Sequence, residues 1–140
     1  MTSKAQYDTK TNKIILSEHE EQVLVIEWAN LYRHKRLDDF LVEYLLAIPN
    51  GGHRHIGVAI KLKKEGVKKG VSDLFLAVPS EHYFGLWVEM KPCGATRSSI
   101  RPDQRKFLQL MNDMGYYATM CAGFENAKRV ICQYLDDVFF

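Results

Sequence analysis

Long hydrophobic runs are missing from this 140-residue chain. A membrane-spanning helix needs about 20 predominantly apolar residues, and no stretch of the sequence approaches that length. The amino terminus, from Met1 to Tyr7, is polar and lacks the apolar centre of a secretion signal. The sequence therefore predicts a cytoplasmic protein, and it gives no reason to expect a membrane partner.

Cysteine is scarce as well, because Cys93, Cys121 and Cys132 are the only three and form no CxxC pair. An odd number of thiols at such spacing argues against both a disulfide framework and a zinc knuckle. The histidines do not stand at zinc-binding spacing from these cysteines either. We expect reduced thiols and no zinc site.

The composition that remains is that of an ordinary globular protein, with 46% apolar and 26% charged residues. About 140 residues suffice for one domain that buries its own core. Residues 1–12 carry no apolar periodicity. We therefore expect 1–16 to form a loose amino-terminal arm and 17–140 to form a single domain.

Positive charge is concentrated in one segment, although the formal net charge of the chain is only +2. The segment 53–70 carries a net charge of +5, and the remainder of the chain carries −3. Such a segment is either a surface that binds a polyanion or a solvated helix face. Its basic residues are Arg54, Lys61, Lys63, Lys64, Lys68 and Lys69.

Apolar periodicity, caps and turn residues predict an α/β protein with the element order helix, strand, helix, strand, strand, helix, strand, helix. In the second helix, Val58, Ile60 and Leu62 are expected to point inward and the lysines outward. The two consecutive strands are expected to form an antiparallel hairpin. The expected ranges are 17–33, 44–48, 55–65, 71–78, 85–91, 102–115, 116–121 and 124–135.

Two carboxylates and a lysine form the sharpest candidate site. Glu89 and Lys91 are two residues apart on a strand and share one face, whereas Met90 points into the opposite, apolar side. If the hairpin forms, Asp73 lies beside Glu89. Adjacent carboxylates repel one another unless a divalent cation joins them, and a nearby lysine can neutralise charge on a phosphate. The alternative is that Asp73 caps a strand and that Glu89 and Lys91 belong to a solvated sheet face.

This Asp…Glu-Met-Lys arrangement resembles the PD-(D/E)XK nuclease superfamily. Further blocks in the same order are similar to stand-alone VRR-NUC domains of phages and bacteria: AIPNGGHR from Ala47, KLKKEGVKKGVSDLFLAVP from Lys61, GLWVEMK from Gly85, Gln104, and MGYYATMCAGFENA from Met114. The resemblance implies a restriction-endonuclease-like αβββαβ core, with a mixed sheet flanked by helices.

The resemblance also implies roles for single residues. Asp73 and Glu89 are expected to bind Mg²⁺ or Mn²⁺, with the Met90 carbonyl as a third ligand, and Lys91 is expected to be the catalytic lysine. Glu18 is expected to hold the metal directly or through water, and Glu21 is the alternative in that acid-rich first turn. Gln104 matches a family glutamine near the site, although a surface amide in a first helical turn would look the same.

Ser72 departs from the family pattern, which usually has proline before the first metal-binding aspartate. This changes the stiffness of the backbone but leaves the ligand in place. The basic segment before Asp73 is expected to grip DNA phosphates through Asn50, Arg54, Lys61, Lys64, Lys68 and Lys69. Asn50, His53 and Arg54 lie on a Gly-rich turn beside the same edge. The alternative is that residues 50–52 form only a turn and that His53 and His55 are ordinary solvated histidines.

These expectations together predict a Mg²⁺- or Mn²⁺-dependent DNA endonuclease that uses no nucleotide cofactor. The resemblance to minimal stand-alone members implies a homodimer that resolves Holliday junctions, and the apolar tail 138–140 is a possible dimer contact. One alternative is a less selective nuclease acting on flaps, nicks or foreign duplex DNA. Another is a DNA-binding module without catalytic activity.

Overall fold

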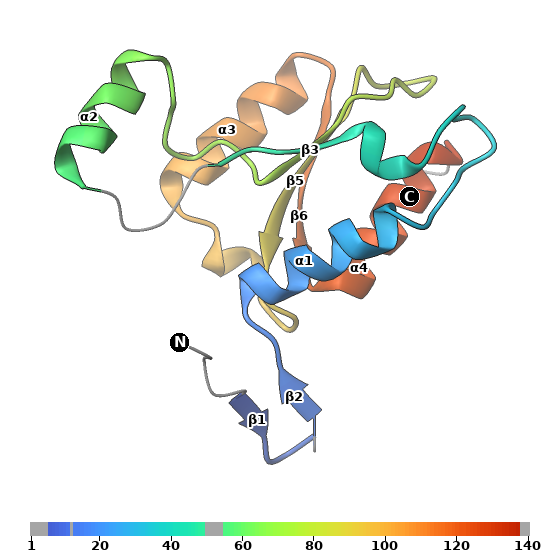
Figure 1. Cartoon of the computed structure of the whole chain (residues 1–140), viewed down its shortest axis with the longest axis horizontal. Coiled ribbons are helices and arrows are strands. Elements are labelled where there is room, and N and C mark those ends of the chain that lie inside the picture. Colours follow the sequence, from blue (N-terminus) through green and yellow to red (C-terminus); the bar gives the residue numbers. More distant parts are fainter. Residues whose placement is uncertain (1–5, 12, 50–54, 138–140) are drawn as a thin grey trace.

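The computed structural model describes residues 6–11, 13–49 and 55–137. This part of the chain contains six strands, four α-helices and two short 3₁₀ helices (Figure 1). In chain order they are β1 (Gln6–Asp8), β2 (Lys13–Ile15), α1 (Glu18–Ala29), η1 (Leu41–Glu43), β3 (Leu45–Ala47), α2 (Ile56–Lys64), β4 (Leu74–Leu76), β5 (Leu86–Lys91), η2 (Arg97–Ser99), α3 (Pro102–Asp113), β6 (Tyr117–Ala122) and α4 (Phe124–Leu135).

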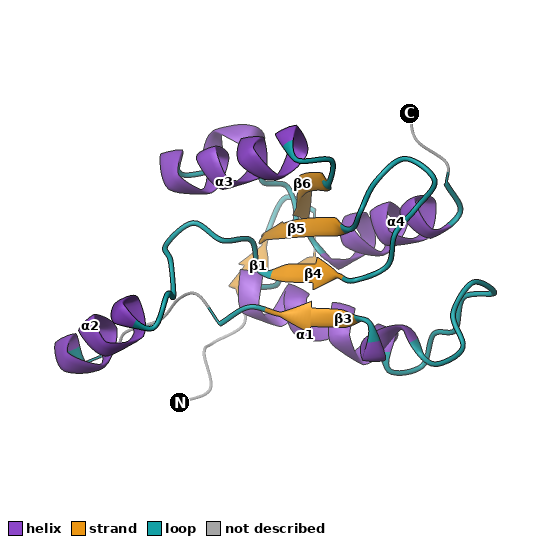
Figure 2. Cartoon of the chain, turned by 90° about the horizontal axis from the view of Figure 1, so that it is seen from above, coloured by secondary structure: helices purple, strands orange, loops and turns teal. Residues whose placement is uncertain are grey.

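The main sheet has the strand order β3-β4-β5-β6 (Figure 2). β3 pairs antiparallel with β4, and β4 pairs antiparallel with β5 in a register that sets Leu74 opposite Val88. β6 runs parallel to β5, because α3 carries the chain back before β6 begins. The sheet is therefore mixed, and the expected hairpin is confirmed.

The core lies between one face of the sheet and helices α1 and α4. Leu86, Val88 and Met90 alternate along β5 toward this core, and all three are fully buried. The intervening residues of β5 face α3 instead, where Trp87 makes an edge-to-face contact with Phe107 at 5.0 Å between ring centroids. Each face of the sheet thus has a helical cover, which fixes where Glu89 and Lys91 point.

The expected order of the eight domain elements is confirmed, with differences at their ends. α1 ends at Ala29 rather than at residue 33: the Asn30 N–H still bonds to the Ile26 carbonyl, but the Leu31 N–H turns to the Trp28 carbonyl, three residues back, at 3.0 Å. β3 and β4 are shorter than expected, but hydrogen bonds such as Ile48 N–H to the Asp73 carbonyl (2.8 Å) continue their pairing beyond the strand ends.

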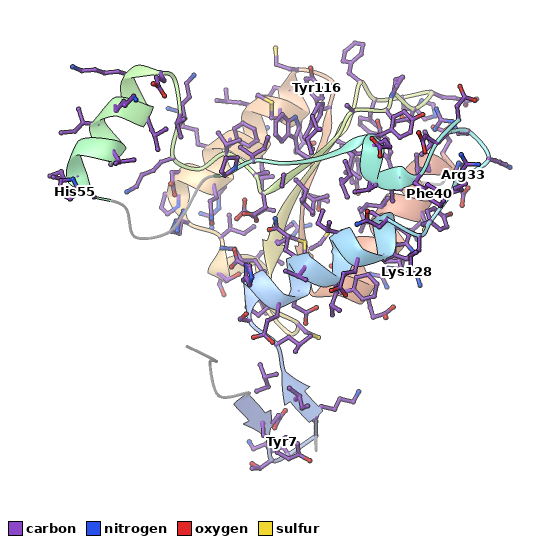
Figure 3. The ribbon with its side chains drawn as sticks, viewed as in Figure 1. Tyr7, Arg33, Phe40, His55, Tyr116 and Lys128 are labelled. Carbon is purple, nitrogen blue, oxygen red and sulfur yellow. The ribbon has the colours of Figure 1, made fainter. Side chains whose placement is uncertain are left out.

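The expected inward packing of α2 is wrong. Ile56, Val58 and Ile60 are 74%, 48% and 52% exposed, and no residue of α2 is buried. The helix projects to one side of the domain, and His55 at its start lies at the far left edge of the molecule in Figure 3. Apolar residues at helical spacing do not specify which surface covers them, and within the described part of this chain α2 adds no residue to the buried core.

The amino-terminal segment contains more structure than a loose arm. β1 and β2 form a two-stranded antiparallel sheet in which Tyr7 lies opposite Ile14. The Asp8 side chain stabilises the turn, because its carboxylate accepts hydrogen bonds from the Lys10 N–H (2.8 Å) and the Thr11 hydroxyl (2.6 Å). This hairpin projects away from the domain, with Tyr7 at its outer end (Figure 3). No helix in the described residues is long and apolar enough to cross a bilayer.

Candidate active site

Three carboxylates from separate parts of the chain meet beside the sheet. Glu18 is the first residue of α1, Asp73 directly precedes β4, and Glu89 lies in β5. One oxygen atom from each side chain lies within 4.8 Å of the oxygen atoms from the other two. The structure thus brings together three of the residues that the sequence singled out.

The hairpin register explains why Asp73 and Glu89 are neighbours. Leu74 pairs with Val88, so the residues just beyond them, Asp73 and Glu89, continue that register. The Met90 N–H donates a hydrogen bond of 2.7 Å to Asp73 Oδ2 and fixes the Asp73 carboxylate against β5. Met90 itself is fully buried in the core, on the side predicted for it.

Lys91 and Gln104 extend the acid cluster toward α3. Lys91 Nζ donates to Gln104 Oε1 at 3.1 Å, and Gln104 Nε2 donates to Glu89 Oε1 at 2.8 Å. Lys91 Nζ also lies 3.9 Å from Glu89 Oε1. Gln104 is buried, so it is not the surface amide that its sequence position also allowed. It holds the lysine and the carboxylate in a fixed relation.

The pKa values of all three acids are raised above their ordinary range. Burial raises the pKa of Glu89 to about 8, and the negative charge of Asp73 adds to the effect, while the positive charge of Lys91 opposes it. Burial also raises the pKa of Asp73, and burial followed by repulsion from Asp73 raises that of Glu18. The cluster therefore favours either a bound proton or a bound cation.

The chemistry of this donor set fits a divalent metal ion. Mg²⁺ and Mn²⁺ take oxygen ligands, and one or two carboxylates with water and phosphate oxygens are their usual set in phosphate-processing proteins. Glu18, Asp73 and Glu89 offer three carboxylates of which Glu89 is only 2% exposed. A cation would remove the repulsion that raises their pKa values.

Glu18, and not Glu21, belongs to the acid cluster. Glu21 lies three residues further along α1, and its Oε2 accepts a hydrogen bond of 2.6 Å from the Phe124 N–H at the start of α4. The residue before Phe124 is Gly123, which has no side chain to cap that helix. Glu21 therefore satisfies a backbone donor of α4 and joins two helices.

Four lysines of the basic segment lie on α2 or in the loop that leads to Asp73. Lys61 and Lys64 lie on α2, Lys68 and Lys69 lie in the loop between α2 and β4, and all four are exposed. Asn50, His53 and Arg54 lie outside the described residues. The lysines of the predicted phosphate-binding surface are thus exposed, and their contacts with phosphate stay a prediction.

One residue near the cluster, Arg101, was missed by sequence reasoning. The Arg101 charge lowers the pKa of Glu18, Asp73 and Glu89, which places its guanidinium within electrostatic reach of all three. Arg101 immediately precedes α3, where the Pro102 helix start was the available signal. Ser72 is fully buried, and its hydroxyl has no hydrogen-bond partner in the described part of the chain. That environment suits the proline usual in the family.

A mixed four-stranded sheet between helices, with acids gathered from the α1 start, the position just before β4, and β5, defines a restriction-endonuclease-like nuclease fold. The VRR-NUC domain profile matches residues 5–125 of the chain. The chain is also similar to a solved structure described as a VRR_NUC domain protein, with 30% identity and a TM-score of 0.74 over 87% of this chain and 90% of that one. A comparison with curated proteins found no match. The chain belongs to the VRR-NUC family, whose function is of the nuclease type with DNA as the partner.

Proposed function

We propose that this chain is a metal-dependent DNA endonuclease that cuts branched DNA and acts as a Holliday junction resolvase. The observation that carries the nuclease chemistry is the meeting of Glu18, Asp73 and Glu89 beside Lys91. The metal would be Mg²⁺ or Mn²⁺, held by these three acids and by the Met90 carbonyl. When bound, such a cation polarises the phosphodiester and lowers the pKa of water.

The chain's own residues divide the remaining work. Lys91, held by Gln104, is placed to orient the attacking water or to neutralise charge that builds on a phosphate oxygen. Gln104 acts through its neighbours, because one amide sets the positions of both Lys91 and Glu89. Lys61, Lys64, Lys68 and Lys69 would draw the DNA backbone toward the acids without reading its sequence.

Selection of branched DNA rests on a homodimer. Two active sites related by a twofold axis suit the two cuts of a junction. The exposed Ile56, Val58 and Ile60 of α2 support this proposal, because a projecting helix with uncovered apolar side chains is favoured when a second copy covers it. Sedimentation of the parent chain should show a dimer, and sedimentation of Ile60→Glu should show a monomer. A monomeric parent chain would contradict the proposed homodimer.

The test is cleavage of a labelled four-way junction and a linear duplex of matched sequence, with Mg²⁺, Mn²⁺ or EDTA. We expect paired, symmetric nicks on the junction alone and their loss in EDTA. Lys91→Ala should slow cleavage by about 100-fold or more while sparing binding. Lys106→Ala, at an exposed site on α3, is the matched control.

Each other outcome selects a different function. Equal cutting of the junction and the duplex would keep the nuclease and replace the resolvase with a less selective enzyme acting on flaps, nicks or foreign duplex DNA. Binding without metal-dependent cutting would leave a DNA-binding module. Cleavage that persists in Lys91→Ala would contradict the role given to the lysine.

A further inference from the structure

Arg101 is joined to the active site through its backbone. Its N–H donates a hydrogen bond of 3.0 Å to Gln104 Oε1, which also accepts from Lys91 Nζ. Gln104 Oε1 is thus a shared acceptor that links the Arg101 backbone to Lys91. Because this bond comes from the backbone, it survives any non-proline substitution of the Arg101 side chain.

The Arg101 side chain is directed to solvent rather than into the network. It is 61% exposed, and its one ion pair in the described residues runs from Nε to Asp103 Oδ1 at 3.4 Å. This contact uses a single nitrogen of a fork that carries five N–H donors. At the same time its positive charge acts on all three acids of the cluster.

A close backbone contact brings the basic loop against the start of α3. Gly70 is buried with φ +85°, and a Cβ placed there would lie 2.6 Å from the Asp103 carbonyl oxygen. Lys68 and Lys69, which precede Gly70, are therefore near the helix start that carries Arg101. The positive end of the α3 dipole lies at the same place.

We propose that the Arg101 guanidinium binds a DNA phosphate adjacent to the one that is cleaved, on the α3 side of the acid cluster. The planar guanidinium of arginine can donate two parallel hydrogen bonds to two oxygens of one phosphate. Because the Arg101 side chain is exposed, it can contact DNA directly, whereas the buried acids repel a phosphate unless a cation lies between them. Arg101 thereby provides a phosphate contact across the acid cluster, separate from Lys91. This inference rests on the proposed nuclease function.

The experiment compares Arg101→Ala and Arg101→Lys with Arg105→Ala, which removes an exposed arginine one turn further along α3. Binding of a labelled four-way junction is measured from low to moderate KCl with Mg²⁺, in a Lys91→Ala background that prevents cleavage. Arg101→Ala should weaken binding about 10-fold or more and reduce the slope of log affinity against log salt by about 0.9. Arg101→Lys should retain most of the slope, and Arg105→Ala should leave it unchanged.

A second measurement locates the phosphate. Junctions that carry a single neutral methylphosphonate near the mapped cut are bound by the Lys91→Ala parent and by Arg101→Ala. At one methylphosphonate position the parent should lose affinity, whereas Arg101→Ala should lose none there, because that variant already lacks the guanidinium that contacts this phosphate.

The outcomes separate the two proposals. If Arg101→Ala keeps the parental slope and methylphosphonate pattern while the parent enzyme still cuts DNA, the arginine contact is wrong and the nuclease stands. If the wild-type chain neither binds nor cuts DNA in Mg²⁺ or Mn²⁺, the proposed function fails, and the arginine contact falls with it.

Discussion

Burial of Glu89 beside two other acids disfavours its ionised form. Its side chain lies against two other acids and accepts a hydrogen bond from Gln104, and its pKa is raised to about 8. Between about pH 4.5 and pH 8 the folded protein therefore holds a proton that the unfolded chain releases. The unfolding free energy of the metal-free protein falls as pH rises through this window.

Replacing Glu89 with glutamine should remove this pH dependence. In EDTA, Glu89→Gln should match the parent in Tm near pH 5 and exceed it near pH 8, because the amide carries no charge at either pH. Mg²⁺ or Mn²⁺ should raise the Tm of the parent near pH 8 and leave the variant nearly unchanged. Glu27→Gln, at an exposed site on α1, is the control. Parallel Tm curves for parent and Glu89→Gln would contradict the coupling.

Sequence reasoning located the strand residues of the site because a strand alternates its side chains strictly. The spacing of Glu89, Met90 and Lys91 predicted their faces, and the hairpin brought Asp73 beside Glu89. Glu18 and Glu21 could not be separated, because residues three apart share one helix face. A tertiary contact, from Glu21 to the start of α4, distinguishes them.

At the scale of elements, the loop between α2 and β4 is held by one close approach. Gly66 and Gly70 both have positive φ, of +100° and +85°. A Cβ at Gly66 would meet no atom within 4 Å, whereas a Cβ at Gly70 would overlap the Asp103 backbone. An alanine at Gly66 therefore tests the left-handed conformation alone, whereas an alanine at Gly70 adds steric overlap.

Gly70→Ala should destabilise the protein more than Gly66→Ala does. We expect about 1 kcal/mol for Gly66→Ala from the left-handed conformation alone, and about 2–3 kcal/mol or more for Gly70→Ala, which adds the overlap. Urea denaturation of both variants measures the difference. Equal losses of unfolding free energy would show that the loop moves away from α3 at little cost.

The order of the elements was predictable because caps, glycines and apolar periods mark it locally. The packing of α2 was not, because its apolar residues fit a buried helix and a projecting one equally well. The β1–β2 hairpin escaped prediction for a related reason. Its strands have three residues each, and all three residues of β2 are exposed. The sequence therefore shows no alternation of buried and exposed residues that would mark a strand.

On the scale of the whole molecule, positive charge gathers toward one side. The exposed lysines of α2 and its following loop lie toward one side, and the loop after α1 that carries Arg33 and Phe40 lies at the opposite end (Figures 1 and 3). We expect this lysine side to attract a polyanion. The charge count of the sequence predicted this asymmetry, but only the fold shows on which side of the molecule the lysines lie.

DNA affinity should therefore depend steeply on salt and on these lysines. The double variant Lys68→Ala, Lys69→Ala should weaken binding and lower the slope of log affinity against log salt by about 2, because two phosphate contacts are lost. Lys35→Ala, in the loop at the opposite end, should leave the slope unchanged. The measurement is a binding titration with linear duplex in the Lys91→Ala background, and flat binding between low and moderate salt would rule out a phosphate-dominated interface.

The contact between Glu21 and the Phe124 N–H bears on the synthesis of the protein. A nascent chain that ends before residue 124 already contains Glu18, Asp73, Glu89 and Lys91, but α1 has no α4 to hold it. α4, which follows every acid of the cluster along the chain, is thus one of the elements that hold α1 and Glu18 in place. Translation that stops before α4 yields a chain with every acid of the cluster and a first helix that lacks this contact, so we expect the truncated chain to hold Glu18 less firmly beside Asp73 and Glu89.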